Sequence, residues 1–218
     1  MVERRLDPDR HIALAALPAS IRPAFAALWN LDLALADVVS SSTDARLGAI
    51  RLAWWRERLE ALDAGDVPAE PRLGAVAREL LPRGIAGREL ARLEDGWLPL
   101  LEPFPWDAPQ ADALQLRGRL LFGTGARLLG GSVDQAERAG ELWSLADAAA
   151  HCSNDGSRRM LLDHAKHAIS TLPQKVDRRL RPLTVLSALA ACDASRGGVF
   201  GRGGAALKHR LTGRFPVS

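Results

Sequence analysis

The sequence of 218 residues contains no tyrosine and few β-branched residues, and alanine, leucine and arginine dominate it. Strands prefer β-branched and aromatic side chains, whereas Ala, Leu and Arg lose little conformational freedom in a helix. The composition therefore predicts an all-α protein. A chain of this length can bury one good core but is short for two, so we expect a single domain over residues 1–218.

Cysteine is also scarce, and no long apolar run is present. Cys152 and Cys192 could form at most one bridge, and a lone pair of this kind is typical of reduced, buried thiols. The charged opening MVERRLDPDR lacks the apolar segment of a signal peptide. The uncharged apolar stretch 182–192 has about half the length of a membrane-spanning helix. We therefore predict a cytoplasmic protein.

Positive charge is concentrated at one end of the chain. Residues 1–150 hold 17 Lys/Arg and 22 Asp/Glu, whereas residues 151–218 hold 12 Lys/Arg and 4 Asp/Glu. A basic final third suits anionic lipid, a diphosphate or an acidic partner, or it forms a solvated helical face beside the acidic part. No aromatic residues suited to base stacking accompany these charges, so a nucleic-acid partner is not predicted.

Periodicity and capping residues predict a series of helices. Asp7 and Pro8 are typical of an N-cap and a first helical residue, and Ser20 is a candidate cap for a second helix. The run 40–43 ends that helix and supplies a cap for a third. The loop 96–109 contains four prolines and two tryptophans, which excludes a regular helix through it. Helices are expected near 8–17, 21–39, 44–62, 71–81, 86–96, 108–130, 133–151, 155–170, 178–193 and 202–212.

The second and third helices carry the most informative patterns. Leu52, Trp55, Leu59 and Leu62 form an apolar stripe that Leu47, Ile50 and Trp54 widen, which indicates a helix buried on more than one side. In the second helix, the position that completes the apolar face is Asp32. A carboxylate on the seam of a bundle needs a partner, water, a metal or a ligand. A salt bridge to Arg51 or Arg56 is the structural interpretation, and a ligand site is the functional one.

The run AALWNLDLALADVVSSSTDARLGAIRLAWWRERLEAL, residues 26–62, resembles the start of the squalene and phytoene synthase family. The signature LG-x-IRL-x-WWR, residues 47–56, is the most specific part of this resemblance. The opening Asp-Pro-x-Arg and the segments 122–131, 140–147 and 180–186 are looser matches. The resemblance implies a single helical bundle of the isoprenoid-synthase type with a central cavity.

Enzymes of that family join two prenyl diphosphates head to head, using two aspartate boxes on facing helices that hold Mg²⁺. Hard cations held by carboxylates stabilise the charge of a departing diphosphate. By the resemblance, the first box falls on Ala36, Asp37 and Ser40, and the second on His151 and Asp155. Only Asp37 and Asp155 remain as metal-ligand candidates, so efficient Mg²⁺-dependent transfer is not expected.

The sequence around the first box resembles that of a non-catalytic branch of the family. Members of this branch serve as assembly factors for respiratory complex I and associate peripherally with membranes. The resemblance thus implies a degenerate protein that binds an isoprenoid-like or lipid ligand, or that assists a membrane complex through a protein partner. No cofactor is expected for such a protein. The alternative is an active synthase that uses Mg²⁺ and a prenyl diphosphate.

Membrane contact would occur through the basic final third, at the inner membrane. The residues expected around the remnant cavity share an ability to bind charge or line an apolar site: Asp32, Asp37, Arg51, Trp55, Arg56, His151 and Asp155.

Overall fold

The computed structural model describes residues 6–195 and 201–216, and it confirms the all-α prediction, because these residues contain helices and no strand. The first half comprises α1 (Pro8–Ala16), η1 (Ala19–Ile21), α2 (Arg22–Ser41), α3 (Ala45–Leu62), α4 (Pro71–Glu79), η2 (Leu81–Arg83), α5 (Gly87–Ala91), α6 (Leu93–Trp97) and η3 (Leu98–Leu101). The second half comprises α7 (Ala108–Leu129), α8 (Val133–His151), α9 (Asp155–Ser170), η4 (Arg178–Leu180), α10 (Arg181–Ala194) and α11 (Gly201–Thr212).

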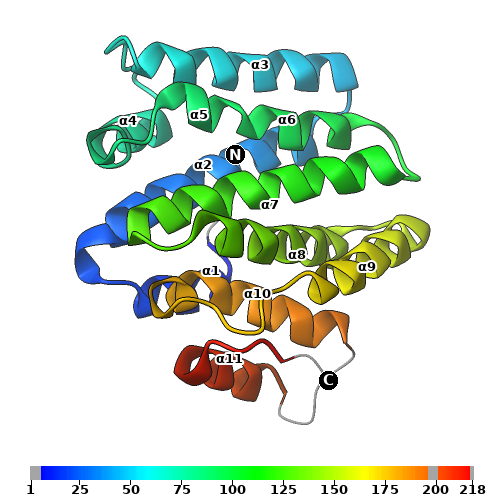
Figure 1. Cartoon of the computed structure of the whole chain (residues 1–218). Helices are drawn as coiled ribbons and strands as arrows, with labels where there is room; N and C mark the ends of the chain where they lie inside the picture. The colour runs from blue at the N-terminus through cyan, green and yellow to red at the C-terminus, as the bar shows by residue number, and fades with distance from the viewer. Residues whose placement is uncertain (1–5, 196–200, 217–218) are drawn as a thin grey trace.

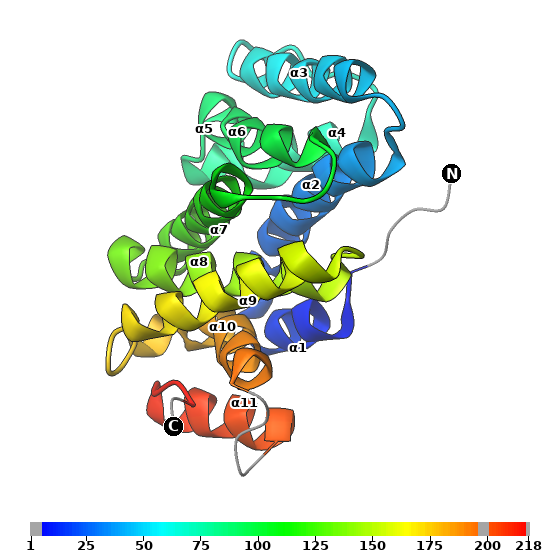
Figure 2. The same cartoon turned by 90° about the vertical axis from the view of Figure 1, so that its right-hand side faces the viewer.

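The helices are stacked in successive layers (Figure 1). α3 forms one edge of the molecule, α2 and α7 lie in the middle, and α11 forms the opposite edge beyond α10. Figure 2 shows α9 lying beside α8. A continuous cluster of buried apolar side chains extends from Ala13 in α1 to Phe215 after α11. Both cysteines are buried free thiols, as expected.

Local signals at the helix ends explain most boundaries. Asp7 caps α1 by accepting a hydrogen bond from the Arg10 amide, and Pro8 follows it, as predicted. The predicted Ser20 cap is wrong, because a 3₁₀ turn at Ala19–Ile21 leads directly into α2 without a side-chain cap. Asp44, rather than residues 40–43, caps α3. The Ser41 and Ser42 hydroxyls instead donate back to carbonyls of the preceding turn, which ends α2.

The prediction that α3 is buried on more than one side is wrong. Its stripe Leu52, Trp55, Leu59 and Leu62 is buried, but Leu47, Ile50 and Trp54 are 61%, 65% and 42% exposed. The reason is the edge position of α3, which leaves one helical face without a neighbour in the described chain. Periodicity shows which residues share a face but does not show how many faces are covered.

A close helix crossing joins α7 and α8 through two glycines. A Cβ atom added to Gly118 would lie 2.1 Å from the Gly140 carbonyl oxygen, and one added to Gly140 would lie 2.2 Å from the Gly118 oxygen. Glycine at both positions therefore allows the two backbones to approach this closely. The crossing fixes α8 against α7 near the buried polar groups described below.

The segment Ala19–Ser41, which contains α2, has the length and apolar composition of a membrane span. In the fold, however, 67% of its apolar window is buried against other helices. α2 thus has the packing of a core helix, and its apolar character is accounted for by the core that it helps to form.

Candidate functional site

The buried centre of the bundle contains a charged network built on Asp32. The Asp32 side chain is fully buried and accepts hydrogen bonds from three other side chains. Arg117 donates from Nε and Nη2 at 2.8 and 2.7 Å, Arg10 donates from Nη2 at 3.1 Å, and the Trp97 indole donates at 3.1 Å. Bidentate pairing of this kind is the strongest geometry between a guanidinium and a carboxylate. The network connects α1, α2, α6 and α7.

Arg117 extends the network to α8. Its Nη1 and Nη2 atoms both lie 3.1 Å from Asp147 Oδ2, and Nη1 also donates to the Ser144 hydroxyl at 3.3 Å. The guanidinium lies over the rings of Trp97 and Trp143, with its carbon 4.4 and 4.9 Å from the ring centroids. Arg117 is therefore enclosed by two carboxylates and two indoles.

Neighbouring charges determine the protonation states of Asp147 and Arg117. Burial alone would raise the pKa of Asp147, but the positive charges of Arg117 and Arg10 outweigh it and hold that pKa below its usual value. Burial alone would lower the pKa of Arg117, and the carboxylates of Asp32 and Asp147 outweigh it and raise that pKa. Asp147 and Arg117 are thus an ionised pair at neutral pH.

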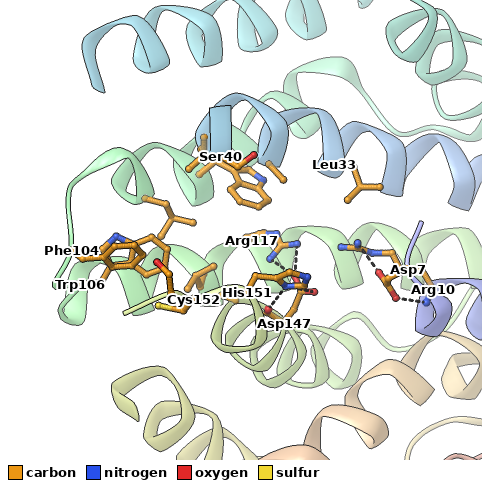
Figure 3. Close-up of a pocket in the computed structure, with 17 residues that line it drawn as sticks. Asp7, Arg10, Leu33, Ser40, Phe104, Trp106, Arg117, Asp147, His151 and Cys152 are labelled. Carbon is orange, nitrogen blue, oxygen red and sulfur yellow. Dashed lines mark hydrogen bonds and ion pairs between the residues drawn. The ribbon is translucent and has the colours of Figure 1, made fainter. Parts of the chain in front are cut away.

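A cavity of about 630 Å³ adjoins the network between α2, α7 and α8, and we call it the central cavity. Apolar and aromatic side chains form most of its wall, and charged groups lie within one part of it. Its lining comprises Asp7, Arg10, Leu33, Ala36, Val39, Ser40, Trp97, Leu100, Phe104, Trp106, Leu114, Arg117, Asp147, Ala148, His151, Cys152 and Ser153. Figure 3 shows Phe104 and Trp106 at one end, Asp7 and Arg10 at the other, and Arg117 with Asp147 between them.

Two pairs of positions, each with the four-residue spacing that shares a helix face, line the cavity from opposing helices. α2 contributes Ala36 and Ser40, and α8 contributes Asp147 and His151. Figure 3 shows Ser40 on one side of the cavity and Asp147 with His151 on the other. This is the arrangement in which two facing aspartate boxes would hold Mg²⁺, but Asp147 is the single carboxylate among the four residues.

These residues do not fit a magnesium site. Mg²⁺ requires oxygen ligands in a nearly octahedral arrangement. Alanine supplies no ligand, histidine supplies nitrogen, and Asp147 Oδ2 is already bonded to Arg117. Within residues 6–195 and 201–216, no group of three or more His, Cys, Asp or Glu side chains has the arrangement of a metal site.

The other residues predicted from the sequence lie in different places. Asp32 is buried in the network behind the cavity, and its partners are Arg10 and Arg117, so the predicted salt bridge to Arg51 or Arg56 is wrong. Among the predicted residues, His151 lines the cavity, and its Nδ1 lies 2.7 Å from the Asp147 carbonyl oxygen.

Asp37 and Asp155, the two remaining box carboxylates, are not part of the cavity wall. Asp37 forms an ion pair with Arg72 at 3.6 Å, on the side of α2 that faces α4. Asp155 begins α9, is exposed and pairs with Arg158 at 2.9 Å. The α8 pair that does face the cavity, Asp147 and His151, lies one helical turn earlier than the aligned pair.

The α3 residues also lie away from the cavity wall. Arg51 donates to the Ser41 hydroxyl at 3.2 Å, and Arg56 pairs with Glu94 at 3.2 Å. Trp55 is buried in the core, with its ring 5.3 Å from that of Trp54 in an edge-on contact. Arg51 and Arg56 thus connect α3 to α2 and α6, and Trp55 contacts a neighbouring ring of α3 itself.

Sequence reasoning missed Arg10, Trp97, Arg117 and Asp147. Arg10 belongs to the Asp-Pro-x-Arg motif, and Asp147 stands four residues before His151, so both had a local signal. Trp97 and Arg117 had none, because their partner Asp32 is 65 and 85 residues away in the chain.

The family model of squalene/phytoene synthase matches residues 4–96, which is less than half of the chain. The match contains α1–α5 and α6 up to Gly96, and therefore Asp32, Ala36 and Ser40, but it ends before Trp97, Arg117, Asp147 and His151. The all-α bundle is consistent with the isoprenoid-synthase type of fold. Comparisons with curated proteins and with solved structures found no significant match.

Proposed function

We propose that this chain is a divergent squalene/phytoene synthase family protein that binds an isoprenoid-like lipid in the central cavity, without efficient head-to-head prenyl transfer. The observation that carries the proposal is the cavity itself. It has the volume of a typical small-molecule site and lies between α2 and α8, which bring Ala36, Ser40 and His151 to its wall. The family match to residues 4–96 supports the same assignment.

The walls suit an apolar chain. Leu33, Val39 and Leu114 provide aliphatic surface, and Phe104 and Trp106 provide aromatic surface at one end. Each methylene group that a ligand transfers from water into such a wall contributes about 0.8 kcal/mol. An isoprenoid chain therefore gains most of its affinity from these side chains, and the charged part of the cavity positions its head.

The box positions argue against efficient transfer. In an intact site, Mg²⁺ held by carboxylates would stabilise the diphosphate as it leaves. Ala36 supplies no ligand atom, His151 supplies nitrogen and Ser40 supplies a neutral hydroxyl in place of a carboxylate. Asp147 is then the single carboxylate, and its Oδ2 is already bonded to Arg117. An active synthase remains the alternative function, and it predicts Mg²⁺-dependent release of diphosphate from farnesyl diphosphate.

A binding experiment tests the proposal directly. Trp97 and Trp106 line the cavity, so titration with isoprenoid lipids should change the tryptophan fluorescence. The variant Ala148→Phe would place a ring in the cavity and should weaken binding at least tenfold, which corresponds to about 1.4 kcal/mol. The matched control is Ala108→Phe, because Ala108 is exposed at the start of α7 and outside the cavity.

The outcomes separate the two functions. Binding that Ala148→Phe weakens, with no diphosphate release, supports the proposal. Release of diphosphate at a catalytic rate would support the synthase instead. If folded protein binds neither prenyl alcohols nor prenyl diphosphates, the lipid-binding proposal is wrong.

The basic final third favours a second candidate function, assistance in assembling a membrane complex. α11 exposes Leu207 and Leu211, at 60% and 69%, beside Lys208 and Arg210, and this surface suits the cytoplasmic face of an inner membrane or an acidic protein partner. Deletion of the gene should then lower a respiratory or other membrane complex without changing cellular isoprenoids. Changed isoprenoids with an intact complex would exclude this role.

A further inference from the structure

The charged network that adjoins the central cavity has no excess of positive charge. Three carboxylates, those of Asp7, Asp32 and Asp147, stand against two guanidinium groups, those of Arg10 and Arg117. The network therefore has a net charge of −1 before His151 is counted. A diphosphate brings at least two further negative charges, and a buried site of low dielectric makes such repulsion strong.

Both arginines are also already engaged. Arg117 uses Nε, Nη1 and Nη2 to bind Asp32, Ser144 and Asp147. Arg10 uses Nη1 for Asp7 and Nη2 for Asp32. To hold a diphosphate, these groups would have to leave buried carboxylates, which would then be unpaired inside the protein. The box positions offer no Mg²⁺ site that could supply the missing positive charge.

The hydrogen-bonding atom that the network leaves free can bind a small neutral head group. Arg10 lines the cavity, but its Nε atom, which has no hydrogen-bond partner among the described residues, is buried out of reach of a ligand there. Asp147 also lines the cavity, and its recorded hydrogen bonds all use Oδ2, while Oδ1 lies 3.9 Å from His151 Nδ1. A ligand hydroxyl can donate to Asp147 Oδ1, whereas a carbonyl oxygen has no proton to donate.

We infer that the central cavity selects an uncharged isoprenoid-like lipid that carries a hydroxyl group, and that it discriminates against the corresponding diphosphate. This inference rests on the proposed lipid-binding function and adds the chemistry of the head group to it. A head group that is neutral leaves every ion pair of the network intact. The selectivity thus follows from the charges that hold the helices together.

The test compares farnesol with farnesyl diphosphate, each with and without Mg²⁺, by tryptophan fluorescence and calorimetry on the full chain. We expect farnesol to bind at least tenfold more tightly than the diphosphate, and Mg²⁺ to change either affinity less than twofold. A second measurement uses His151→Lys, which adds a positive charge at an exposed edge of the cavity. This variant should tighten diphosphate binding at least threefold and change farnesol binding by a smaller factor.

The control variant is His167→Lys, because His167 is exposed on α9 and does not line the cavity. It should change neither affinity. Tighter binding of the diphosphate, Mg²⁺-dependent binding, or equal affinities for the two ligands would each overturn the inference while the lipid-binding function stands. Absence of binding by both ligands to the folded protein would instead refute the proposed function itself.

Discussion

Replacement of Asp32 by alanine tests whether the buried network holds the bundle together. Asp32 accepts four hydrogen bonds from Arg10, Trp97 and Arg117, and its side chain is fully buried. Its removal leaves both guanidinium groups buried, at 3% and 2% exposure, with one carboxylate each. Loss of one partner from a buried ion pair costs about 3–5 kcal/mol. Because Asp7 and Asp147 remain, we expect a loss of free energy of unfolding near the lower limit, about 3 kcal/mol.

Urea denaturation at pH 7, followed by circular dichroism, measures this loss as a shift of midpoint at constant slope. The matched control is Asp37→Ala on the same helix. Asp37 is 29% exposed in its side chain and pairs with Arg72 at 3.6 Å, so its removal should cost less than about 1 kcal/mol.

A double replacement shows whether the loss comes from unpaired charge. Asp32→Leu combined with Arg117→Met removes one charge of each sign and should recover at least half of the stability lost in Asp32→Leu alone, because apolar groups can replace buried ion pairs. If Asp32→Ala costs no more than Asp37→Ala, the network contributes nothing to stability and the reasoning is refuted. If the alanine variant does not fold, Asp32→Asn, which keeps the shape and one acceptor, gives the same comparison.

Three further replacements test other parts of the fold. Burial lowers the pKa of His209 to about 4 from 6.5, so acidification between these values should reduce the free energy of unfolding by up to about 3 kcal/mol, because the unfolded chain is protonated first. His209→Gln should remove this part of the pH dependence and the exposed His167→Gln should not, as urea midpoints from pH 4 to 7 will show. Gly118→Ala should cost about 1–3 kcal/mol or more, because its Cβ would meet the Gly140 carbonyl, whereas Gly74→Ala, with open space in α4, should stabilise by about 0.5–1 kcal/mol in the same assay. Trp97→Phe removes one donor to Asp32 and should cost about 1 kcal/mol, and an unchanged midpoint would show that this bond contributes nothing.

The neutral state of His209 follows from its burial. Nδ1 lies 3.1 Å from the Arg214 carbonyl oxygen, which can only accept, so Nδ1 carries the proton. Nε2 lies 2.8 Å from the Thr184 hydroxyl, which donates to the Leu180 carbonyl oxygen at 3.0 Å. Protonation of Nε2 would place a positive charge inside the packed interface between α10 and α11, which is why acid should loosen α11.

Local sequence signals predicted the helices well, because capping residues and apolar spacing act within one or two turns. The Asp7 cap and the break in the proline-rich loop illustrate this. The edge position of α3 was missed for the same reason, since exposure of Leu47 and Ile50 depends on which helices pack beside α3. The anomaly at Asp32 was visible as a polar residue in an apolar series, but its partners were not, because they come from distant segments of the chain.

The candidate site was harder to predict, because a shift of a few residues along α8 changes which side chains face the cavity. Alignment of the second box to His151 and Asp155 directs attention to Asp155, which is exposed at the start of α9, and overlooks Asp147, which lines the cavity. The four-residue spacing of Asp147 and His151 is the better guide, since it places both side chains on the face of α8 that lines the cavity. A pair of polar residues with this spacing can be compared with the apolar face of the same helix, which shows whether the pair points into the bundle.

Stability and ligand choice depend on the same side chains. Among the described residues that line the central cavity, Arg10 and Arg117 supply the fixed positive charge, and both are bound to Asp32 in the core. A ligand that takes these cations must weaken contacts between α1, α2 and α7, whereas a neutral lipid leaves them in place. Variants of the network should therefore change stability first, and variants of the wall, such as Ala148→Phe, should change binding with little change in stability. If network variants instead changed binding and left stability unchanged, Arg10 and Arg117 would be ligand-binding groups, and a diphosphate would be the better candidate ligand.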